Sequence, residues 1–371
     1  MTPPLNVVQL LPALESGGVE RSTLEIADAL VRAGHRAVVV SAGGRLVPDL
    51  IGRGAEHVAL DIGRKSPLTL RHVGALRRLV AGADIVHARS RLPAWLGWWA
   101  LRGLPRASRP RFVTTVHGLN SPSRYSAIMA RGERVICVSD TVRDYVLRHY
   151  PATDPSRLRT IPRGIDPSAF PRTPAHDAAA RAAVAALHPA LDGDGPLLLL
   201  PGRGTRLKGH GDALELLQAL RGGGVDARLW MPGARDPARA AYVAELEVEA
   251  VQRGVADALV LSPPTAQIAQ AYAASDLVLQ LSRKPESFGR TVIEALSVDR
   301  PVIGWAHGGV GELLRELQPA GAVPPFDAAA LHATARALLA APPALPATIP
   351  YTLERMQRDT LTLYTELAAS A

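Results

Sequence analysis

The chain has 371 residues, of which 47% are hydrophobic and 20% charged, so it can bury a core and bulk disorder is excluded. This length indicates two domains. The formal net charge is +8, but it is unevenly placed: residues 1–170 hold 24 Lys and Arg against 13 Asp and Glu, whereas residues 171–371 hold 18 against 21. A strongly basic half and a slightly acidic half indicate different binding partners for the two halves.

Strands and helices alternate along the N-terminal half. The apolar run at 6–11 predicts a buried strand, and the apolar residues between Gly17 and Gly34 have helical spacing. A strand at 35–41 completes a strand–turn–helix–strand unit. Further strands are predicted at 56–60, 84–87, 112–116 and 134–138, and further helices at 68–80, 93–102 and 140–150. This alternation predicts a parallel sheet covered on both faces.

Prolines interrupt the pattern between 162 and 196, where we place a linker at 167–189. A second alternating series follows, with strands predicted at 197–201, 227–231, 258–261, 277–281 and 301–305, and helices at 209–220, 237–253, 267–273, 289–298 and 331–341. We therefore expect Rossmann-like domains at 1–166 and 190–350, with a last helix in 351–371 packing back on the first domain. Ligand sites in such domains lie at the carboxyl ends of the strands.

Cysteine content and hydropathy exclude several kinds of protein. Cys137 is the only cysteine, which excludes an intrachain disulfide and a Cys-rich zinc site, and we interpret it as a buried structural thiol. The N-terminal residues lack a signal-peptide pattern. The most apolar window, 92–101, is ten residues long, whereas a bilayer span needs about 20. We therefore expect a cytoplasmic protein.

The segment 284–296 carries the most informative motif. An apolar strand enters it and a helix leaves it at Gly289, and a helix N-terminus offers free N–H groups and partial positive charge that suit a diphosphate. Glu286 in the loop and Glu294 in the helix can accept hydrogen bonds from the hydroxyls of a sugar and a ribose. From spacing alone, an ordinary surface helix with an exposed Glu explains the pattern equally well.

Two further turns strengthen the case for a phosphate site. The loop at 202–209 follows a strand and places Arg203 and Lys208 where they can pair with phosphates, although it lacks the Walker A order. The chain has only three lysines, and Lys208 and Lys284 both lie in these loops. The Gly-rich turn at 306–312 again joins a strand to a helix. Solvated loop charge and a simple turn are the alternatives.

Together these motifs resemble the retaining glycosyltransferases of family 4, which have the GT-B fold of two facing Rossmann-like domains with a cleft between them. The resemblance extends in order over nearly the whole chain and rests on Glu286-x7-Glu294, on the Gly-Arg…Lys-Gly loop at 202–209, on Gly-Gly…Glu at 308–312, on Gly17-Gly18-Val-Glu, on Thr-Val-His117-Gly and on Ile-Pro-Arg163-Gly-Ile-Asp. Arg163 stands where Asn is common, and Gly311 where Pro is common.

The resemblance implies roles for these residues. Arg203 and Lys208 would neutralise the diphosphate of a nucleotide-sugar donor, Glu294 would hold the ribose and Glu286 would contact the sugar. The remaining donor contacts would come from the backbone at Gly17, Gly18, Phe288 and Gly289. His117 would lie near the reacting sugar, and a structural loop histidine is its alternative reading.

The resemblance also implies the course of the reaction. The leaving phosphate would help to deprotonate the incoming hydroxyl, and the anomeric configuration would be retained. The protein then mainly positions the reactants and stabilises charge. Since cationic side chains would take the place of a metal, we expect no cofactor and no divalent metal requirement.

The acceptor would bind the basic N-terminal domain. Arg21, Arg89 and Arg91 are candidate acceptor-binding residues. The helix at 93–102 places three tryptophans, Trp95, Trp98 and Trp99, on one face, flanked by arginines. This stripe suits either the domain core or a bilayer interface with anionic lipid. We expect an anionic acceptor and peripheral contact with the inner membrane. No nucleic-acid partner is expected, because no RRM, KH or zinc-finger pattern is present.

The sequence thus predicts an enzyme that transfers a sugar from a UDP-, GDP- or ADP-sugar to a glycan or lipid-linked acceptor. The pattern at 117–150 resembles bacterial lipopolysaccharide-type transferases. The alternatives are a nucleotide-sugar epimerase or hydrolase of the same fold, and a non-catalytic nucleotide-sugar binding protein. A dinucleotide-binding dehydrogenase is disfavoured, because the glycine loop at 17–20 lacks Gly-x-Gly-x-x-Gly spacing.

Overall fold

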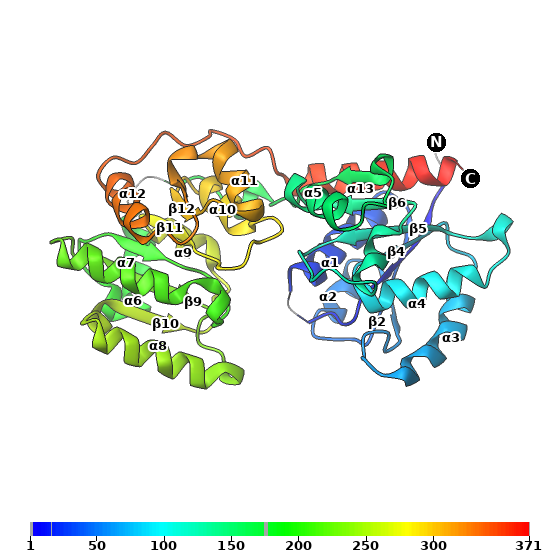
Figure 1. Cartoon of the computed structure of the whole chain (residues 1–371), viewed down its shortest axis with the longest axis horizontal. Coiled ribbons are helices and arrows are strands. Elements are labelled where there is room, and N and C mark those ends of the chain that lie inside the picture. The colour runs from blue at the N-terminus through cyan, green and yellow to red at the C-terminus, as the bar shows by residue number, and fades with distance from the viewer. Residues whose placement is uncertain (1–2, 16, 174–176, 371) are drawn as a thin grey trace. The chain divides into compact units, whose positions relative to one another are not determined.

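The computed structural model describes residues 3–15, 17–173 and 177–370, and the chain divides into two compact units. Unit 1 comprises Met1–Gly164 and Leu353–Ala371, and unit 2 comprises Ile165–Thr352. Each unit is an α/β domain in which helices cover both faces of a parallel sheet (Figure 1). The GT-B class of two Rossmann-like domains is therefore confirmed.

Unit 1 contains a seven-stranded parallel sheet in the order β3-β2-β1-β4-β5-β6-β7. Its strands are β1 (Asn6–Leu10), β2 (Arg36–Ser41), β3 (Glu56–Ala59), β4 (Ile85–Ala88), β5 (Arg111–Val116), β6 (Arg134–Cys137) and β7 (Leu158–Thr160). Its helices are α1 (Gly18–Arg32), α2 (Val47–Gly52), α3 (His72–Val80), α4 (Arg91–Arg102), α5 (Asp140–His149) and α13 (Leu353–Ala369), with short 3₁₀ helices such as η1 (Pro67–Arg71) and η3 (Ser126–Ala130) between them.

The C-terminal helix α13 packs against α1 and completes the core of unit 1. It buries Leu363 and Tyr364 in the same cluster as Leu30 of α1. The Tyr364 hydroxyl lies 2.5 Å from Nδ1 of the buried His87 in β4. Burying the apolar face of an amphipathic helix is what holds it on a domain. Its place in unit 1 agrees with the sequence expectation for residues 351–371, of which Ala371 lies outside the described residues.

Unit 2 contains a six-stranded parallel sheet in the order β10-β9-β8-β11-β12-β13. Its strands are β8 (Leu197–Leu199), β9 (Arg228–Pro232), β10 (Leu259–Ser262), β11 (Leu277–Gln280), β12 (Val302–Trp305) and β13 (Ala322–Val323). Its helices are α6 (Ala178–Leu187), α7 (His210–Gly222), α8 (Ala240–Gln252), α9 (Ile268–Ala274), α10 (Arg290–Ser297), α11 (Gly308–Leu317) and α12 (Ala328–Ala340). Leucines of β8, β9 and β11 form the centre of its core.

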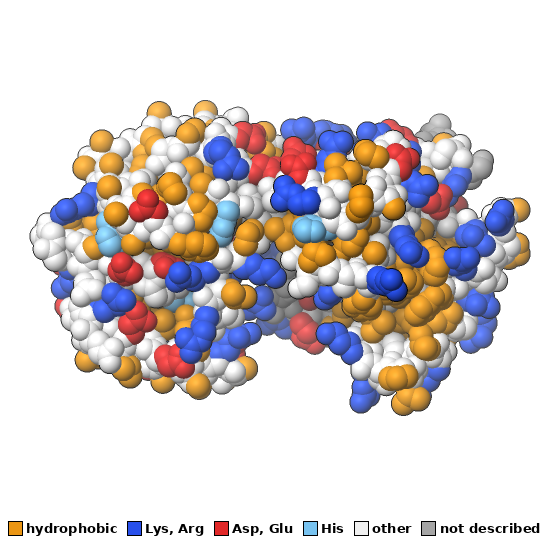
Figure 2. Space-filling model, viewed as in Figure 1, with side chains coloured by type: hydrophobic (Ala, Val, Ile, Leu, Met, Phe, Trp, Pro, Cys, Tyr) orange, Lys and Arg blue, Asp and Glu red, His pale blue; other side chains and the backbone are white. Residues whose placement is uncertain are grey.

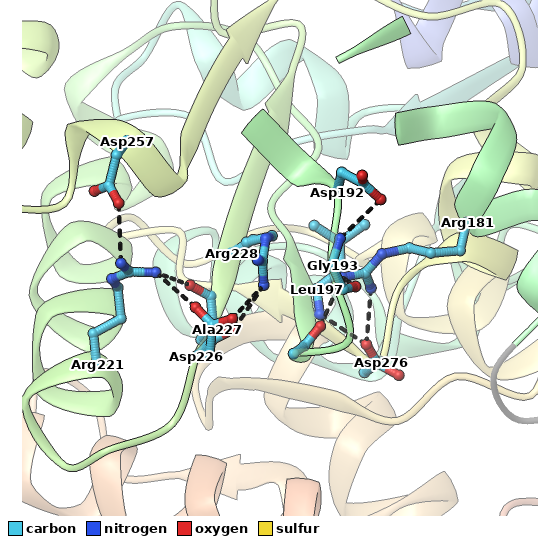
Figure 3. Close-up of polar contacts among 11 residues, drawn as sticks. Arg181, Asp192, Gly193, Leu197, Arg221, Asp226, Ala227, Arg228, Asp257 and Asp276 are labelled. Carbon is cyan, nitrogen blue, oxygen red and sulfur yellow. Dashed lines mark hydrogen bonds and ion pairs between the residues drawn. The ribbon is translucent and has the colours of Figure 1, made fainter. Parts of the chain in front are cut away.

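The segment 167–189 is not a free linker, and this corrects the sequence expectation. Residues 174–176 lie outside the described residues, but α6 packs against α9 and belongs to unit 2. Arg181 of α6 pairs with Asp276 at 3.2 Å, and the same carboxylate accepts the Leu197 N–H at 2.7 Å (Figure 3). These bonds fix α6 at the amino-terminal edge of β8 and β11. The prolines made this ordered helix resemble a connection.

Ion pairs also stabilise the rest of this amino-terminal edge. Arg221 of α7 contacts Asp226 at 3.2 Å and Asp257 at 3.0 Å, and Arg228 contacts Asp226 at 3.1 Å (Figure 3). A pocket of about 680 Å³ lies at this edge, beside Arg181 and Asp276. Because Arg181 and Asp276 pair with each other and Arg336 donates to the Gly223 carbonyl, the opposite edge of the sheet is the better candidate site.

Candidate active site

The donor motifs lie at the carboxyl edge of the sheet in unit 2, at a topological switch point. Strands β8 and β11 are neighbours, and the chain leaves β8 toward β9 on one side and β11 toward β12 on the other. Ligands of doubly wound domains bind where the connections diverge in this way. The loop after β8 carries Arg203 and Lys208, and the loop after β11 carries Glu286.

Lys208 and Glu286 form an ion pair across this switch point. The Lys208 Nζ atom lies 2.5 Å from Glu286 Oε1, and the two side chains are 27% and 25% exposed. The Ser282 hydroxyl donates to the same Oε1 at 2.5 Å. Burial raises the pKa of Glu286, but the Lys208 charge and the bonds from Lys208 and Ser282 outweigh it, so that its pKa falls below the ordinary value. The carboxylate is therefore ionised and accepts hydrogen bonds only.

Two glycines at the start of α11 bring the Gly-rich turn at 306–312 against the loop that carries Glu286. A Cβ on Gly309 would lie 2.5 Å from Phe288 Cα, and one on Gly308 would lie 2.6 Å from the Glu286 carbonyl oxygen. The Gly309 N–H donates to that carbonyl at 2.8 Å. His307 Nε2 lies 2.8 Å from the Ser282 carbonyl. The Gly-Gly pair thus positions the loop that carries Glu286.

Helix α10 begins directly after this loop. Gly289 is its N-cap with φ +112°, in a region that side chains rarely adopt, and the next turn points its free N–H groups toward the carboxyl edge. The Phe288 side chain is buried and packs edge-on against Tyr351, with ring centroids 5.6 Å apart. Only the backbone at Phe288 is therefore available to a ligand.

Glu294 lies in the second turn of α10 and is 12% exposed at its side chain. Its Oε2 accepts a hydrogen bond from the Tyr272 hydroxyl of α9 at 2.9 Å. Burial and the nearby Glu294 carboxylate raise the pKa of Tyr272 well above its ordinary value, so the phenol remains a donor. Sequence reasoning missed Tyr272, because its contact with Glu294 depends on the packing of α9 against α10.

Arg203 is exposed and makes no side-chain hydrogen bond or ion pair with the residues that the structure describes. Its neighbour Gly202 has φ +155°, and the Gly202 N–H donates to the Pro232 carbonyl at 2.9 Å. Gly209 has φ +75°, and a Cβ there would lie 2.1 Å from the Leu281 carbonyl oxygen. The loop backbone is thus held between two strands while the Arg203 guanidinium extends into solvent.

Unit 1 has its own constellation at the carboxyl edge of its sheet. His117 follows β5, and its Nδ1 lies 2.7 Å from Nη2 of Arg163. The Nη1 atom of Arg163 donates to the Gly18 carbonyl at 2.6 Å, at the start of α1. Burial lowers the pKa of His117 well below its ordinary value, and the charge of Arg163 lowers it further. The imidazole is therefore neutral.

The expected acceptor arginines occupy three different environments. Arg89 is only 4% exposed and its Nε donates to Gln9 Oε1 at 2.7 Å, so it is not on a surface that an acceptor could contact. Arg91 is half-buried and its Nη1 donates to Ser126 Oγ at 3.2 Å, whereas Arg21 is exposed on α1. A cavity of about 20 Å³ lies beside Arg89 and His117, which is room for about one water and not for a sugar.

Within 3–15, 17–173 and 177–370, no group of three or more His, Cys, Asp or Glu side chains is arranged to hold a metal ion. In the same ranges, no helix is both long and apolar enough to cross a membrane. Cys137 is fully buried at the end of β6, and burial raises the pKa of its thiol to about 12, which confirms its interpretation as a structural thiol.

Comparison with known proteins identifies the family. The chain matches Glycosyltransferase Family 4 over residues 16–169 and Glycosyl transferases group 1 over residues 188–354. The chain belongs to the family 4 glycosyltransferases. This glycosyltransferase is 25% identical to a glycosyltransferase from Rickettsia africae, with a TM-score of 0.83 and full coverage of both chains.

Two more likenesses extend this picture. The fold matches that of HepE from Anabaena in complex with UDP and glucose, with a TM-score of 0.77, 18% identity, and 98% and 100% of the two chains covered. The sequence is 28% identical over 252 residues to a D-inositol 3-phosphate glycosyltransferase from Actinosynnema mirum. That match covers 63% of this glycosyltransferase and 58% of the relative, so the chain spans little more than half of the relative's length.

Proposed function

We propose that this glycosyltransferase moves a sugar from a nucleotide-sugar donor to a hydroxyl of an anionic glycan or lipid-linked acceptor, with retention of configuration. The observation that carries the proposal is the ion pair between Lys208 and Glu286 at the switch point of unit 2. Its Nζ and Oε1 atoms are 2.5 Å apart. A lysine cation suits a diphosphate and an ionised carboxylate suits a sugar hydroxyl. Both groups are in place on one edge of one sheet.

The pair also explains how the Lys208 charge is neutralised when no donor is bound. Glu286 neutralises Lys208, and the three donors of the ammonium leave it able to bind phosphate oxygens as well. Arg203 extends from the same loop into solvent, so it can approach a diphosphate without breaking a bond to the described residues. The N-terminus of α10 adds backbone N–H donors.

In the proposed reaction, the bond from the anomeric carbon to the donor phosphate breaks while a bond to the acceptor oxygen forms on the same face. The acceptor proton passes to the leaving phosphate oxygen. Lys208 and Arg203 stabilise the charge that grows on the diphosphate, which is the step that most needs the protein. We propose that these two cations serve in place of a divalent metal, so that transfer continues in EDTA.

The nature of the two substrates follows from chemistry and from the likenesses. HepE was solved with UDP and glucose, which supports a nucleotide-sugar donor and makes UDP-sugars the first to test. The Actinosynnema mirum relative is named for a phosphorylated acceptor, which supports an anionic acceptor for the basic unit 1. We propose that the product enters cell-envelope glycan of the lipopolysaccharide type, at the cytoplasmic face of the inner membrane.

A thermal-shift screen of UDP-, GDP- and ADP-sugars tests the donor, because a ligand that binds the folded state raises its unfolding temperature. One nucleotide class should stabilise the wild type, and Lys208→Ala should lose most of that shift while its own unfolding temperature changes little. Product analysis with the labelled donor then separates transfer from hydrolysis or epimerisation. Absence of any shift at millimolar donor would contradict the proposal.

A further inference from the structure

The basic charge of unit 1 is concentrated in one segment. Residues 62–132 hold 13 Lys and Arg and a single acidic residue, Asp84, so this stretch accounts for the whole positive balance of the unit. Asp84 lies at the amino-terminal end of β4, where its Oδ2 accepts the Asn6 N–H at 2.7 Å. Arg111 of this segment pairs with Glu133 at 2.8 Å, whereas its exposed arginines form no ion pair with the residues that the structure describes.

These residues form one continuous surface, because η1 packs on α3, α3 packs on α4, and α4 packs on η3. Arg77 of α3 lies over Gly103 at the end of α4, which ties the two helices together. We name this surface the basic face. Its exposed basic side chains are Arg64, Lys65, Arg71, Arg78, Arg102, Arg106, Arg124 and Arg131.

The tryptophans form the centre of the basic face. Gly97 turns the other side of α4 toward the sheet, where a Cβ would lie 2.7 Å from the Leu10 side chain. Trp95 and Trp98 pack edge-on with centroids 5.6 Å apart, and Trp99 is 37% exposed. The stripe is therefore on the outer side of the domain and not in its core, which removes the first of the two readings that the sequence left open.

Arginines frame this stripe. The Arg102 guanidinium lies 4.6 Å from the Trp98 ring centroid, and Arg131 lies 5.7 Å from the Trp95 ring. The Trp95 indole N–H donates to the Tyr125 carbonyl at 2.9 Å. The Trp95 and Trp98 rings are thus each covered in part by a cation, as in side chains that lie where apolar and charged environments meet.

Exposed apolar side chains add to the basic face. Leu68 and Leu70 of η1 are 70% and 51% exposed, and Tyr125 is 38% exposed. Figure 2 shows hydrophobic side chains gathered over α4, with Lys and Arg around them. Exposed leucine and tryptophan side chains on a cationic surface are unfavourable in water. Their burial at the boundary between lipid headgroups and acyl chains lowers the free energy of the protein.

We propose that the basic face docks unit 1 on a bilayer that contains anionic lipid. The arginines contact the headgroups while Leu68, Leu70 and Trp99 enter the interface. This deepens the proposed function, since it rests on a membrane-surface acceptor and names the surface that brings unit 1 to it. A second copy of this chain is a poor occupant, because like charges would meet. A nucleic acid would use the arginines but not the leucines.

Flotation with phosphatidylcholine vesicles, with and without phosphatidylglycerol, tests the proposal. The first variant is Arg78→Gln/Arg106→Gln/Arg124→Gln, and its control is Arg143→Gln/Arg148→Gln/Arg157→Gln, which makes the same change in net charge elsewhere on unit 1. Each basic side chain near an anionic surface contributes about 1 kcal/mol to binding, which is about fivefold in affinity. The first triple variant should therefore bind anionic vesicles roughly 100-fold more weakly than the wild type. The control triple should lose much less.

The apolar contribution has its own pair of variants. Leu68→Gln/Leu70→Gln should weaken binding to anionic vesicles about tenfold. Val248→Gln/Val251→Gln changes two exposed valines of α8 in unit 2 and should leave binding unchanged. Equal binding to neutral and anionic vesicles, or a basic-face variant that binds like its control, would overturn the proposal. The proposal would also be overturned if the protein bound oligo(U) RNA more tightly than anionic vesicles and the Leu68→Gln/Leu70→Gln change did not weaken RNA binding.

A donor-induced thermal shift on the same variants keeps the two proposals separate, because the donor motifs lie in unit 2. Vesicle binding without stabilisation by any nucleotide sugar would reject the proposed function and leave the docking surface intact. Stabilisation by a donor without vesicle binding would reject the docking surface alone.

Discussion

Arg163 and His117 form a pair in which one side chain determines the chemistry of the other. Nη2 of Arg163 lies 2.7 Å from Nδ1 of His117. A guanidinium can only donate, so Nδ1 accepts and the ring proton of the neutral imidazole resides on Nε2. Since Nη1 of Arg163 also holds the Gly18 carbonyl at 2.6 Å, one guanidinium fixes both the histidine and the glycine loop.

Replacing Arg163 should therefore change both the rate and its pH dependence. Arg163→Asn releases His117 and the Gly18 loop, and we expect turnover to fall about 10–100-fold, as for small displacements of positioning groups. The charge of Arg163 helps to keep the pKa of His117 low, so its removal moves the acid limb of the pH–rate profile to higher pH. Release of nucleoside diphosphate from the donor, followed over pH, measures both effects.

Arg163→Lys is the matched variant, because it keeps the charge and loses the two-point donation. It should restore the pH profile of the wild type and only part of the rate. A profile that does not differ between Arg163→Asn and the wild type would show that Arg163 does not act through His117.

The second prediction concerns Lys208. Lys208→Ala removes the cation at the diphosphate, and we expect kcat to fall about 10²–10³-fold, as when one transition-state donor is lost. Without Lys208, Glu286 keeps the hydrogen bond from the Ser282 hydroxyl, so the fold should persist. Lys284→Ala is the control, because Lys284 is exposed in the neighbouring loop and should retain near-normal turnover. Similar losses in both variants would point to general charge and not to the pair.

The third prediction tests the contact between α11 and the Glu286 loop. Gly309→Ala places a methyl group 2.5–2.7 Å from backbone atoms of Phe288, so the loop must move. We expect the unfolding temperature to fall and donor affinity to drop about tenfold or more. Gly222→Ala, at the end of α7 with no atom within 4 Å of the new methyl, should do neither. Isothermal titration with the donor found in the screen gives the affinities.

The fourth prediction is a loss of stability in acid. Burial lowers the pKa of His87 and His117 well below 6.5 and that of His210 to about 4. On acidification these histidines are protonated at a higher pH in the unfolded chain than in the folded chain. The free energy of unfolding is therefore at its full value above about pH 6.5 and falls as the pH drops toward 4. Each histidine contributes up to about 1.4 kcal/mol per pH unit in that window.

Unfolding in urea at pH 7.5, 6.5 and 5.5 measures this trend. His210→Asn should make the decline shallower, whereas His149→Gln changes an exposed histidine and should leave the slope unchanged. Stability that is flat over this range, or that rises in acid, would contradict the assignment of neutral buried imidazoles.

Much of the fold could be predicted from the sequence, because buried parallel strands are short apolar runs and the intervening helices keep a 3.6-residue period. The edge strands β7 and β13 have three and two residues and carry no such period, so they were not predicted. The prolines around α6 made its segment resemble a linker, although its alanines are compatible with a helix. The bond from Arg181 to Asp276, 95 residues away, shows that tertiary contacts decide its place.

The donor motifs were predictable as loops, but their contacts were not. The sequence places Lys208 and Glu286 after two strands, and only the order of those strands makes them neighbours. Ser282 carried no signal of its own, and Arg163 was visible only as a departure from a family pattern. For the tryptophans, helical spacing shows that they share a face, but the close approach of Gly97 to Leu10 determines which way that face points.

Helix α13 has a consequence for how the protein is made. Unit 2 is a continuous insertion, Ile165–Thr352, between the two parts of unit 1. During synthesis unit 1 cannot be completed until α13 has followed unit 2, because α13 supplies the Tyr364 hydroxyl to His87 and covers Leu30. A chain that stops after Thr352 therefore leaves the core of the glycine-loop domain open.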